Sequence, residues 1–241
     1  MEKLVEEMYH QNGDKKVILV CHSMGCLYSY YFLRQHDQDW KDRYIQSWIT
    51  VAAPFGGAVR AVQALTSGVN FHTELFSKSG LRDLERTFSS FSLLQPAAPI
   101  YGDNIILSYA DVNYTAKDMP LIYKLIGDEA GLRMWEQSSR LIPDYGPPGV
   151  ETHCLRGKNV PTVERISYPD AASFPSFPVT INGPGDGTVN QISADVCLRW
   201  ADSSNDFHTE EFENVIHQNL VKHPDVVSYI TRQVLHANFD V

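Results

Sequence analysis

The stretch VILVCHSMG, residues 17–25, predicts a strand, a tight turn and the start of a helix. Val17–Val20 is a short unbroken apolar run rich in β-branched residues, which is typical of a buried parallel strand. After Gly25, neither Gly nor Pro interrupts the chain as far as Gln35, so a helix is expected there. A second apolar run, Trp48–Ala53, predicts another strand. This strand–helix–strand order indicates a right-handed parallel crossover in an α/β sheet.

The serine at the turn, Ser23, is the candidate nucleophile. A nucleophile elbow holds its serine in a strained backbone conformation, which is tolerated when the residues two before and two after it are small. Here these residues are Cys21 and Gly25, so the first glycine of the usual G-x-S-x-G pattern is replaced by a larger residue. The backbone N–H of Met24 then becomes an oxyanion donor, and one such donor contributes on the order of 3 kcal/mol. The strand–turn–helix context favours a nucleophile over a simple turn serine.

A serine nucleophile needs a general base and a carboxylate that orients the base. In the α/β-hydrolase fold the order along the chain is Ser, Asp, His. Asp186 lies in a glycine-rich turn after a predicted strand at 178–182, although an Asx-turn or helix-capping aspartate fits the same local pattern. His217 directly follows a predicted strand at 212–216 and is the candidate base. His223 is the competitor, and its place immediately before a predicted helix favours His217.

Composition restricts the class of protein. The 241 residues are 43% hydrophobic and 20% charged, as expected for one large globular domain or a domain with a subdomain. The formal net charge of −9 argues against a nucleic-acid partner, which requires a basic surface. No window approaches the roughly 20 apolar residues of a transmembrane segment. The acidic, helix-like start is not a secretory signal peptide.

Neither a metal nor a cofactor is expected. The four cysteines (Cys21, Cys26, Cys154, Cys197) lack any CxxC spacing. The histidines outside the candidate triad and its competitor show no paired metal-ligand spacing and are assigned to surface or core roles: His10, His22, His36, His72, His153, His208 and His236. Of these, His22 is expected to pack in the turn beside Ser23.

Three regions are expected along the chain. Residues 1–57 form the first part of an α/β-hydrolase core with the nucleophile elbow. Residues 58–150 are long, rich in aromatic residues and poor in regular periodicity, which is typical of a cap or lid. Residues 151–241 form the second part of the core and carry the acid and the base.

The sequence resembles the lecithin:cholesterol acyltransferase family, and most closely its lysosomal phospholipase A branch. The motifs that carry the resemblance run over nearly the whole chain: HSMG (22–25), WKDRYI (40–45), APFGG (53–57), SGVN (67–70), NYT (113–115), PPGV (147–150), HCLRG (153–157), VPT (160–162) and GDGTVN (185–190).

The resemblance implies a phospholipid acyl hydrolase and O-acyltransferase that works through an acyl-enzyme, with Ser23, Asp186 and His217 as its triad. It also implies a Cys154–Cys197 disulfide, which would contribute roughly 4 kcal/mol by loop closure, and a mobile lid near residues 68–110. Asn113 begins an N-glycosylation sequon. The implied partners are a phospholipid at a membrane or lipoprotein surface and a water or lipid alcohol as acyl acceptor.

Two features depart from the family pattern. Phe55 stands where the family's proline–aromatic–glycine turn normally has Trp. The chain also starts at the helix before the nucleophile strand, so we expect an α/β-hydrolase fold truncated at its N-terminus. In that case the loop with the second oxyanion donor is missing, and Val17–Val20 forms an uncovered apolar edge.

Two alternatives remain open from the sequence. One is a generic lipase or carboxylesterase with the same triad, and the other is a catalytically inactive truncated fragment. The paired cysteines and the sequon indicate a lysosomal or extracellular location, although this chain shows no signal peptide.

Overall fold

The computed structural model describes residues 1–69, 77–202 and 206–239. Residues 70–76 fall in the lid expected at 68–110 and lie outside the described residues, as do Asn70 of the SGVN motif and His72. The chain divides into two compact units, each made of separate stretches of sequence. Unit 1 comprises Met1–Phe55, Asp144–Val160 and Ala194–Val241, and unit 2 comprises Gly56–Pro143 and Pro161–Ser193.

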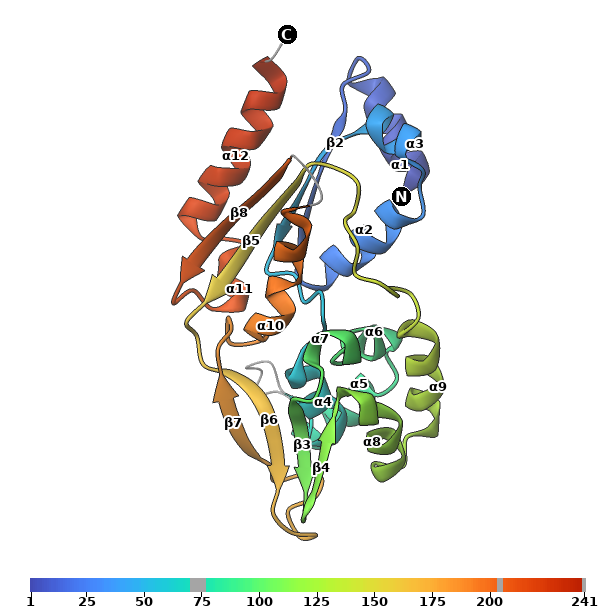
Figure 1. The fold of residues 1–241 in the computed structure, drawn as a ribbon, viewed down its shortest axis with the longest axis vertical. Helices are drawn as coiled ribbons and strands as arrows, with labels where there is room; N and C mark the ends of the chain where they lie inside the picture. The colour runs from blue at the N-terminus through green and yellow to red at the C-terminus, as the bar shows by residue number, and fades with distance from the viewer. Residues whose placement is uncertain (70–76, 203–205, 240–241) are drawn as a thin grey trace. The chain divides into compact units, whose positions relative to one another are not determined.

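Unit 1 is built on a four-stranded parallel sheet with the order β1-β2-β5-β8 (Figure 1). Its strands are β1 (Val17–His22), β2 (Ile45–Val51), β5 (Thr152–Lys158) and β8 (Phe207–Glu213). The two central strands, β2 and β5, are buried along almost their whole length, because neighbouring layers cover both faces. The edge strands β1 and β8 are more exposed, and Val20 in β1 is 49% exposed.

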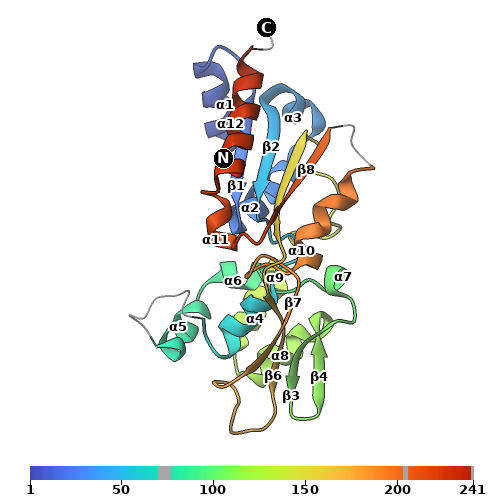
Figure 2. The same ribbon diagram turned by 90° about the vertical axis from the view of Figure 1, so that its left-hand side faces the viewer.

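Helices lie on both faces of this sheet (Figures 1 and 2). The helices of unit 1 are α1 (Glu2–Gln11), α2 (Met24–Arg34), α3 (Gln38–Tyr44), η2 (Asp195–Trp200), α11 (His217–Leu220) and α12 (Pro224–Phe239). α12 packs Val226 and Tyr229 against Ile49 and Leu155 of the two central strands. The predicted parallel crossover is present, because β1, α2 and β2 follow one another and β1 pairs with β2 in parallel.

Two strands of this sheet end earlier than the apolar patterns predict. β2 ends at Val51 rather than Ala53, and Ala52 has a positive φ of 54°, which turns the chain out of the sheet. β8 ends at Glu213 rather than Ile216, because Asn214 has a φ of 60° and leaves the extended conformation. The apolar alternation around 212–216 therefore continues past the end of the strand.

Unit 2 contains a mixed sheet with the order β4-β3-β6-β7. Its strands are β3 (Ile105–Tyr109), β4 (Val112–Thr115), β6 (Thr162–Tyr168) and β7 (Val179–Gly183). Its helices are α4 (Val59–Thr66), α5 (Lys78–Glu85), α6 (Ser89–Leu93), α7 (Ala98–Tyr101), η1 (Ala116–Asp118), α8 (Met119–Leu125) and α9 (Glu129–Ser138), and α10 (Gln191–Ala194) begins at its end. Tyr168 of β6 donates a hydrogen bond to Thr66 of α4 at 2.8 Å, which joins the sheet to the helices.

The units differ from the expected regions in one main respect. Residues 161–193 were expected in the second part of the hydrolase core, but they belong to unit 2. The reason is strand pairing, because β6 pairs in parallel with β3, and β7 pairs antiparallel with β6. The region 58–150 also has more regular structure than its weak periodicity predicts.

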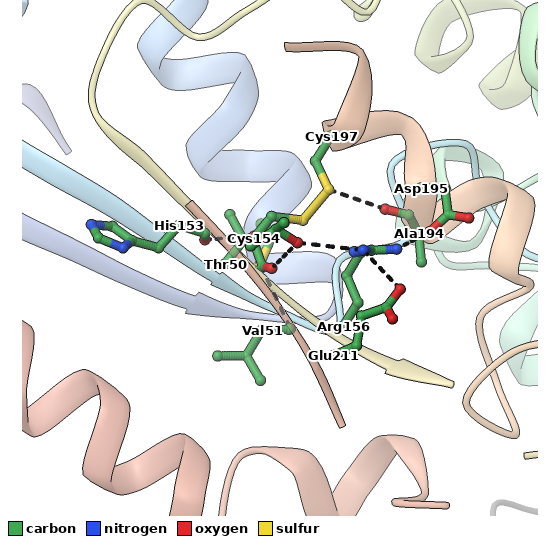
Figure 3. Close-up of a disulfide and its surroundings, with 11 residues drawn as sticks. Thr50, Val51, His153, Cys154, Arg156, Ala194, Asp195, Cys197 and Glu211 are labelled. Atoms are coloured by element: carbon green, nitrogen blue, oxygen red, sulfur yellow. Dashed lines mark hydrogen bonds and ion pairs between the residues drawn. A yellow bond between two sulfur atoms is a disulfide. The ribbon is translucent and has the colours of Figure 1, made fainter. Parts of the chain in front are cut away.

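The structure pairs Cys154 of β5 with Cys197 of η2, which is the disulfide that the family resemblance implied (Figure 3). Beside it, Arg156 is buried and forms ion pairs with Asp195 and with Glu211, the latter at 3.0 Å. The disulfide and the two ion pairs of Arg156 together connect η2 and β8 to the central strand β5. Among the described helices, none combines the length and the apolar character that a membrane crossing needs.

Candidate active site

Ser23 occupies the turn between β1 and α2, as the sequence predicts. Its backbone has φ 53° and ψ −129°, in the positive-φ region that non-glycine residues rarely adopt. The Ser23 N–H donates to the carbonyl of Val51 at 2.9 Å, so the neighbouring strand β2 holds the turn. A strained serine at the carboxyl end of a parallel strand is the geometry of a nucleophile elbow.

The residues around Ser23 fit the elbow unequally. Met24 is the first residue of α2, so its N–H is one of the donors that helix geometry leaves without an intrahelical acceptor. Cys21 is half-buried and lies 3.6 Å from the carbonyl of Ile49 through its Sγ. At Gly25, an added Cβ would meet no heavy atom within 4 Å. The close packing that would require a small residue two positions after the serine is therefore not found at Gly25.

His217 is the histidine that contacts Ser23. It is the first residue of α11, its side chain is buried, and its Nε2 lies 2.8 Å from Ser23 Oγ. His22 reaches the same helix, with its Nε2 3.3 Å from the His217 carbonyl oxygen. The sequence assigned His22 only to packing in the turn. Its contact depends on α11 returning to the elbow, which local sequence does not reveal.

His223, the competing candidate, has a different environment. It directly precedes α12, and its carbonyl accepts the Val227 N–H at 3.0 Å in the manner of a helix-entry residue. Its ring lies near Phe212 and its Nδ1 is 3.8 Å from Asp225. The structure therefore brings His217, and not His223, within hydrogen-bond distance of Ser23.

Asp186 lies in unit 2, in the turn after β7. Its side chain is buried, and its Oδ1 accepts the backbone N–H groups of Thr188 at 3.0 Å and Val189 at 2.7 Å. Thr162 of β6 accepts the Gly187 N–H at 2.7 Å and so holds the turn from the side. These contacts include the Asx-turn that the alternative interpretation expects. The pairing of Asp186 with His217 in unit 1 stays a prediction from the sequence.

A hydrogen-bond network joins the Asp186 turn to the chain after the APFGG motif. Asn190 Oδ1 accepts from the Val59 N–H at 3.1 Å and from the Tyr101 hydroxyl at 3.0 Å, and its amide donates to the Val163 carbonyl at 2.8 Å. Ser193 accepts the Gly56 N–H at 2.9 Å. The sequence marks Asn190 as part of a motif but assigns it no role, and it does not mark Ser193.

Phe55, the first of the two departures from the family pattern, belongs to an aromatic cluster in unit 1. Its ring lies edge-on to Tyr30, Trp48 and Trp200, with centroid distances of 5.8, 5.9 and 5.0 Å. These edge-to-face arrangements are favourable for aromatic pairs. Phenylalanine therefore packs at this position without a hydrogen-bonding group, and the cluster includes Tyr30 of α2.

The remaining thiols near the elbow are not paired in a disulfide. Cys26 in α2 is fully buried, and its burial, together with the neighbouring Cys21, raises the pKa of its thiol well above the usual range. A buried thiol of raised pKa is a poor nucleophile. Of the groups near the turn, Ser23 with His217 is thus the pair suited to attack a carbonyl.

Comparison with known proteins identifies the family of this chain. The family model described as lecithin:cholesterol acyltransferase matches residues 1–130 and 131–240. Chicken phosphatidylcholine-sterol acyltransferase is 35% identical over 223 residues, covering 92% of this chain and 54% of the relative. Human lysosomal phospholipase A and acyltransferase is 33% identical over 238 residues, covering 98% and 57% respectively. The chain thus spans about half the length of the curated relatives it matches.

A solved structure supports the fold. The chain resembles a protein in the crystal structure of a Tle4–Tli4 complex with a TM-score of 0.58 and 11% identity, covering 97% of this chain and 63% of the other. At this identity the likeness concerns the fold alone. Together with the parallel sheet and the elbow, it identifies an α/β-hydrolase fold. The chain belongs to the lecithin:cholesterol acyltransferase family.

Proposed function

We propose that this protein is a serine-dependent phospholipid acyl hydrolase and O-acyltransferase. The observation that carries the proposal is the 2.8 Å distance between Ser23 Oγ and His217 Nε2, at an elbow whose backbone is strained. A hydroxyl with a histidine at this distance can lose its proton as it attacks a carbonyl carbon.

The reaction proceeds in two steps. His217 takes the Ser23 proton while Oγ attacks the ester carbonyl of a glycerophospholipid, and the lysophospholipid leaves with the proton from His217. The acyl-enzyme then reacts with water, which completes hydrolysis, or with a lipid alcohol, which completes acyl transfer. In both steps the N–H of Met24 stabilises the oxyanion, because it points from the N-terminus of α2.

Asp186 is the proposed acid of the triad. Its carboxylate orients the imidazole of His217 and stabilises the imidazolium that forms during attack. Its Oδ1 accepts two backbone N–H groups, from Thr188 and Val189, which hold the turn. A carboxylate has enough acceptor positions for both roles.

The phospholipid substrate and the two acceptors are supported by the relatives, which are named phosphatidylcholine-sterol acyltransferase and lysosomal phospholipase A and acyltransferase. The lysosomal or extracellular location is supported by the Cys154–Cys197 disulfide, which forms in oxidising compartments. Asn113 in β4 is exposed and could accept a glycan there.

Labelling with a fluorophosphonate probe tests the nucleophile and base without requiring turnover. Ser23→Ala should abolish labelling, whereas Ser79→Ala, which removes an exposed hydroxyl in α5, should leave it unchanged. His217→Asn should slow labelling on the order of 10³-fold or more, and the matched variant His223→Asn should not. Undiminished labelling of Ser23→Ala would refute the assignment of the nucleophile.

Substrate preference separates the proposed function from a generic lipase or carboxylesterase. The purified protein should hydrolyse phospholipid presented in vesicles in preference to a short soluble ester, and mass spectrometry should detect an acylated product when a lipid alcohol is added. The reverse preference, with Ser23 still labelled, favours the carboxylesterase.

A further inference from the structure

A compact group of three metal-ligating side chains lies in unit 1 and plays no part in the chemistry at Ser23. Glu151 directly precedes β5, His153 is the second residue of β5, and His208 is the second residue of β8. His153 and His208 are register partners in the parallel pair of strands, which places their side chains side by side on one face of the sheet. Among the described residues, these are the three His, Cys, Asp or Glu side chains whose possible ligand atoms lie close enough together to hold one metal ion.

The distances within the group suit a small divalent cation. His153 Nε2 lies 2.9 Å and His208 Nε2 lies 3.8 Å from the same oxygen, Glu151 Oε1, and all three donor atoms lie within 4.8 Å of one another. A tetrahedral zinc with bonds of 2.0–2.2 Å holds its ligand atoms about 3.4 Å apart. The separations between the donor atoms therefore need to change by about 1.4 Å or less to close around an ion.

The surroundings of His153 resemble the support that metal-binding histidines usually have. Its ring is buried and its Nδ1 lies 2.8 Å from the hydroxyl of Tyr229 in α12. A ligating imidazole normally donates its other N–H to such an oxygen, which fixes the tautomer and the ring orientation. In Figure 3 the ring of His153 points away from the Cys154–Cys197 disulfide, because successive residues of a strand face opposite sides of the sheet.

We propose that Glu151, His153 and His208 form a zinc site that ties β5 to β8. The metal takes the place of the proton on His153 Nε2. The neutral imidazole then carries its proton on Nδ1, and this N–H donates a hydrogen bond to the Tyr229 oxygen. Two imidazoles and a carboxylate supply three ligands, and water completes the tetrahedron. The site is separate from the elbow, since it lies near the start of β5 and β8, on the face that α12 covers.

One adjustment is required on binding. The rings of His153 and His208 are nearly parallel, with an interplanar angle of 16° and centroids 4.7 Å apart. Each imidazole binds a metal in its own ring plane, so one ring must turn. His208 is the ring that turns, because its side chain is 52% exposed whereas His153 is held by Tyr229 and is 2% exposed.

Calorimetric titration of the full chain with Zn²⁺, after removal of metals with a chelator, tests the site. We expect one zinc per chain, and binding at least ten-fold weaker in His208→Ala and in Glu151→Gln. These two positions are partly exposed, so the variants should fold, whereas His153 is buried and is not a suitable first target. Unchanged affinity in both variants would overturn the proposal.

Two controls exclude other histidines. His10→Ala removes an exposed histidine that lies 2.9 Å from Asp14 and should leave zinc affinity unchanged. His217→Ala removes the candidate catalytic base next to His22 and should also leave it unchanged. Loss of binding in His217→Ala together with full binding in His208→Ala would assign the zinc to the elbow and refute the site proposed here.

A third variant tests Tyr229 as a positioning residue. Tyr229→Phe keeps the packing of α12 on the sheet but removes the hydrogen bond to His153, and zinc affinity should fall by about ten-fold. Zinc should also raise the Tm of the unmodified protein but not that of His208→Ala, because only a site that exists in the folded state stabilises it. Equal Tm increases in the two proteins would contradict a link between β5 and β8.

Discussion

The turn that carries Ser23 in unit 1 and the turn that carries Asp186 in unit 2 both follow a strand, but different interactions hold them. At Ser23 the backbone itself is strained, and one hydrogen bond to Val51 of the adjacent strand fixes it. At Asp186 the side chain accepts two backbone N–H groups, and Thr162 of a neighbouring strand accepts a third.

The two turns differ in how strongly they indicate a function. A serine in a positive-φ turn is uncommon and costs backbone energy, so its presence indicates a function. An aspartate that caps its own turn is common and stabilises the turn by itself. The elbow therefore supports Ser23 strongly, whereas the geometry of its turn does not separate a catalytic Asp186 from a structural one.

Asp186→Asn gives the largest expected effect and separates these two roles. Asparagine keeps Oδ1 and therefore the two hydrogen bonds that fold the turn, but it loses the charge that stabilises the imidazolium of His217. If Asp186 is the triad acid, the rate at which a fluorophosphonate labels Ser23 should fall on the order of 10⁴-fold, while the Tm stays nearly constant. A normal labelling rate in a stable variant would leave Asp186 with only its structural role.

Removal of the disulfide tests how the sheet that carries Ser23 is stabilised. Cys154 and Cys197 are separated by 43 positions in the sequence, and loss of this link should lower the unfolding free energy by about 4 kcal/mol. Chemical denaturation of the Cys154→Ala/Cys197→Ala double variant measures the loss. Cys21→Ala, which removes a free thiol, is the control. If the unfolding free energy of the double variant falls no more than that of Cys21→Ala, the disulfide does not stabilise the fold.

Glu85 in α5 predicts a pH dependence for unit 2. Burial raises the pKa of this carboxyl from 4.5 to about 7. The folded protein thus keeps a proton that the unfolded chain loses between these two values, and the unfolding free energy falls as pH rises from about 4.5 to about 7, by up to about 3 kcal/mol. Above the folded-state pKa the decline stops.

Glu85→Gln should remove this decline, because glutamine does not ionise. We expect its Tm to exceed that of the unmodified protein at pH 8 and to match it near pH 4.5. Glu129→Gln, an exposed position in α9, is the control and should keep the original pH profile. Parallel Tm profiles of the Glu85 variant and the unmodified protein would contradict the raised pKa.

Thr162→Val has the smallest expected effect and sharpens the contrast between the two turns. Valine keeps the shape of the side chain but leaves the Gly187 N–H without its acceptor, so the unfolding free energy should fall by about 1–2 kcal/mol. If the Asp186 turn depends on this neighbour, labelling of Ser23 should slow as well. Thr180→Val in β7 is exposed and should change neither quantity.

The local features of this protein follow from its sequence. The β-branched run at 17–20, the serine turn and the uninterrupted stretch after it predict β1, the elbow and α2, because each depends on residues that are neighbours in the chain. The candidate base follows partly from position. His217 lies beyond the strand that ends the parallel sheet, even though that strand stops four residues before it, at Glu213.

Other features depend on strands that meet over long sequence distances. The pattern at 178–182 predicts a strand but not its partner. Its pairing with β6, and the pairing of β6 with β3, assign this part of the chain to unit 2. In the same way, no local spacing relates His153 to His208, and the register of β5 against β8 brings them together.

The sequence by itself thus determined the parallel strand, the elbow at Ser23 and the family, since local conformational preference and residue identity suffice for these. Only the tertiary structure decided that His217 contacts Ser23, that 161–193 leave the parallel sheet and that Glu151, His153 and His208 converge. Strand register and helix docking depend on the packing of distant side chains, and a linear pattern does not encode these contacts.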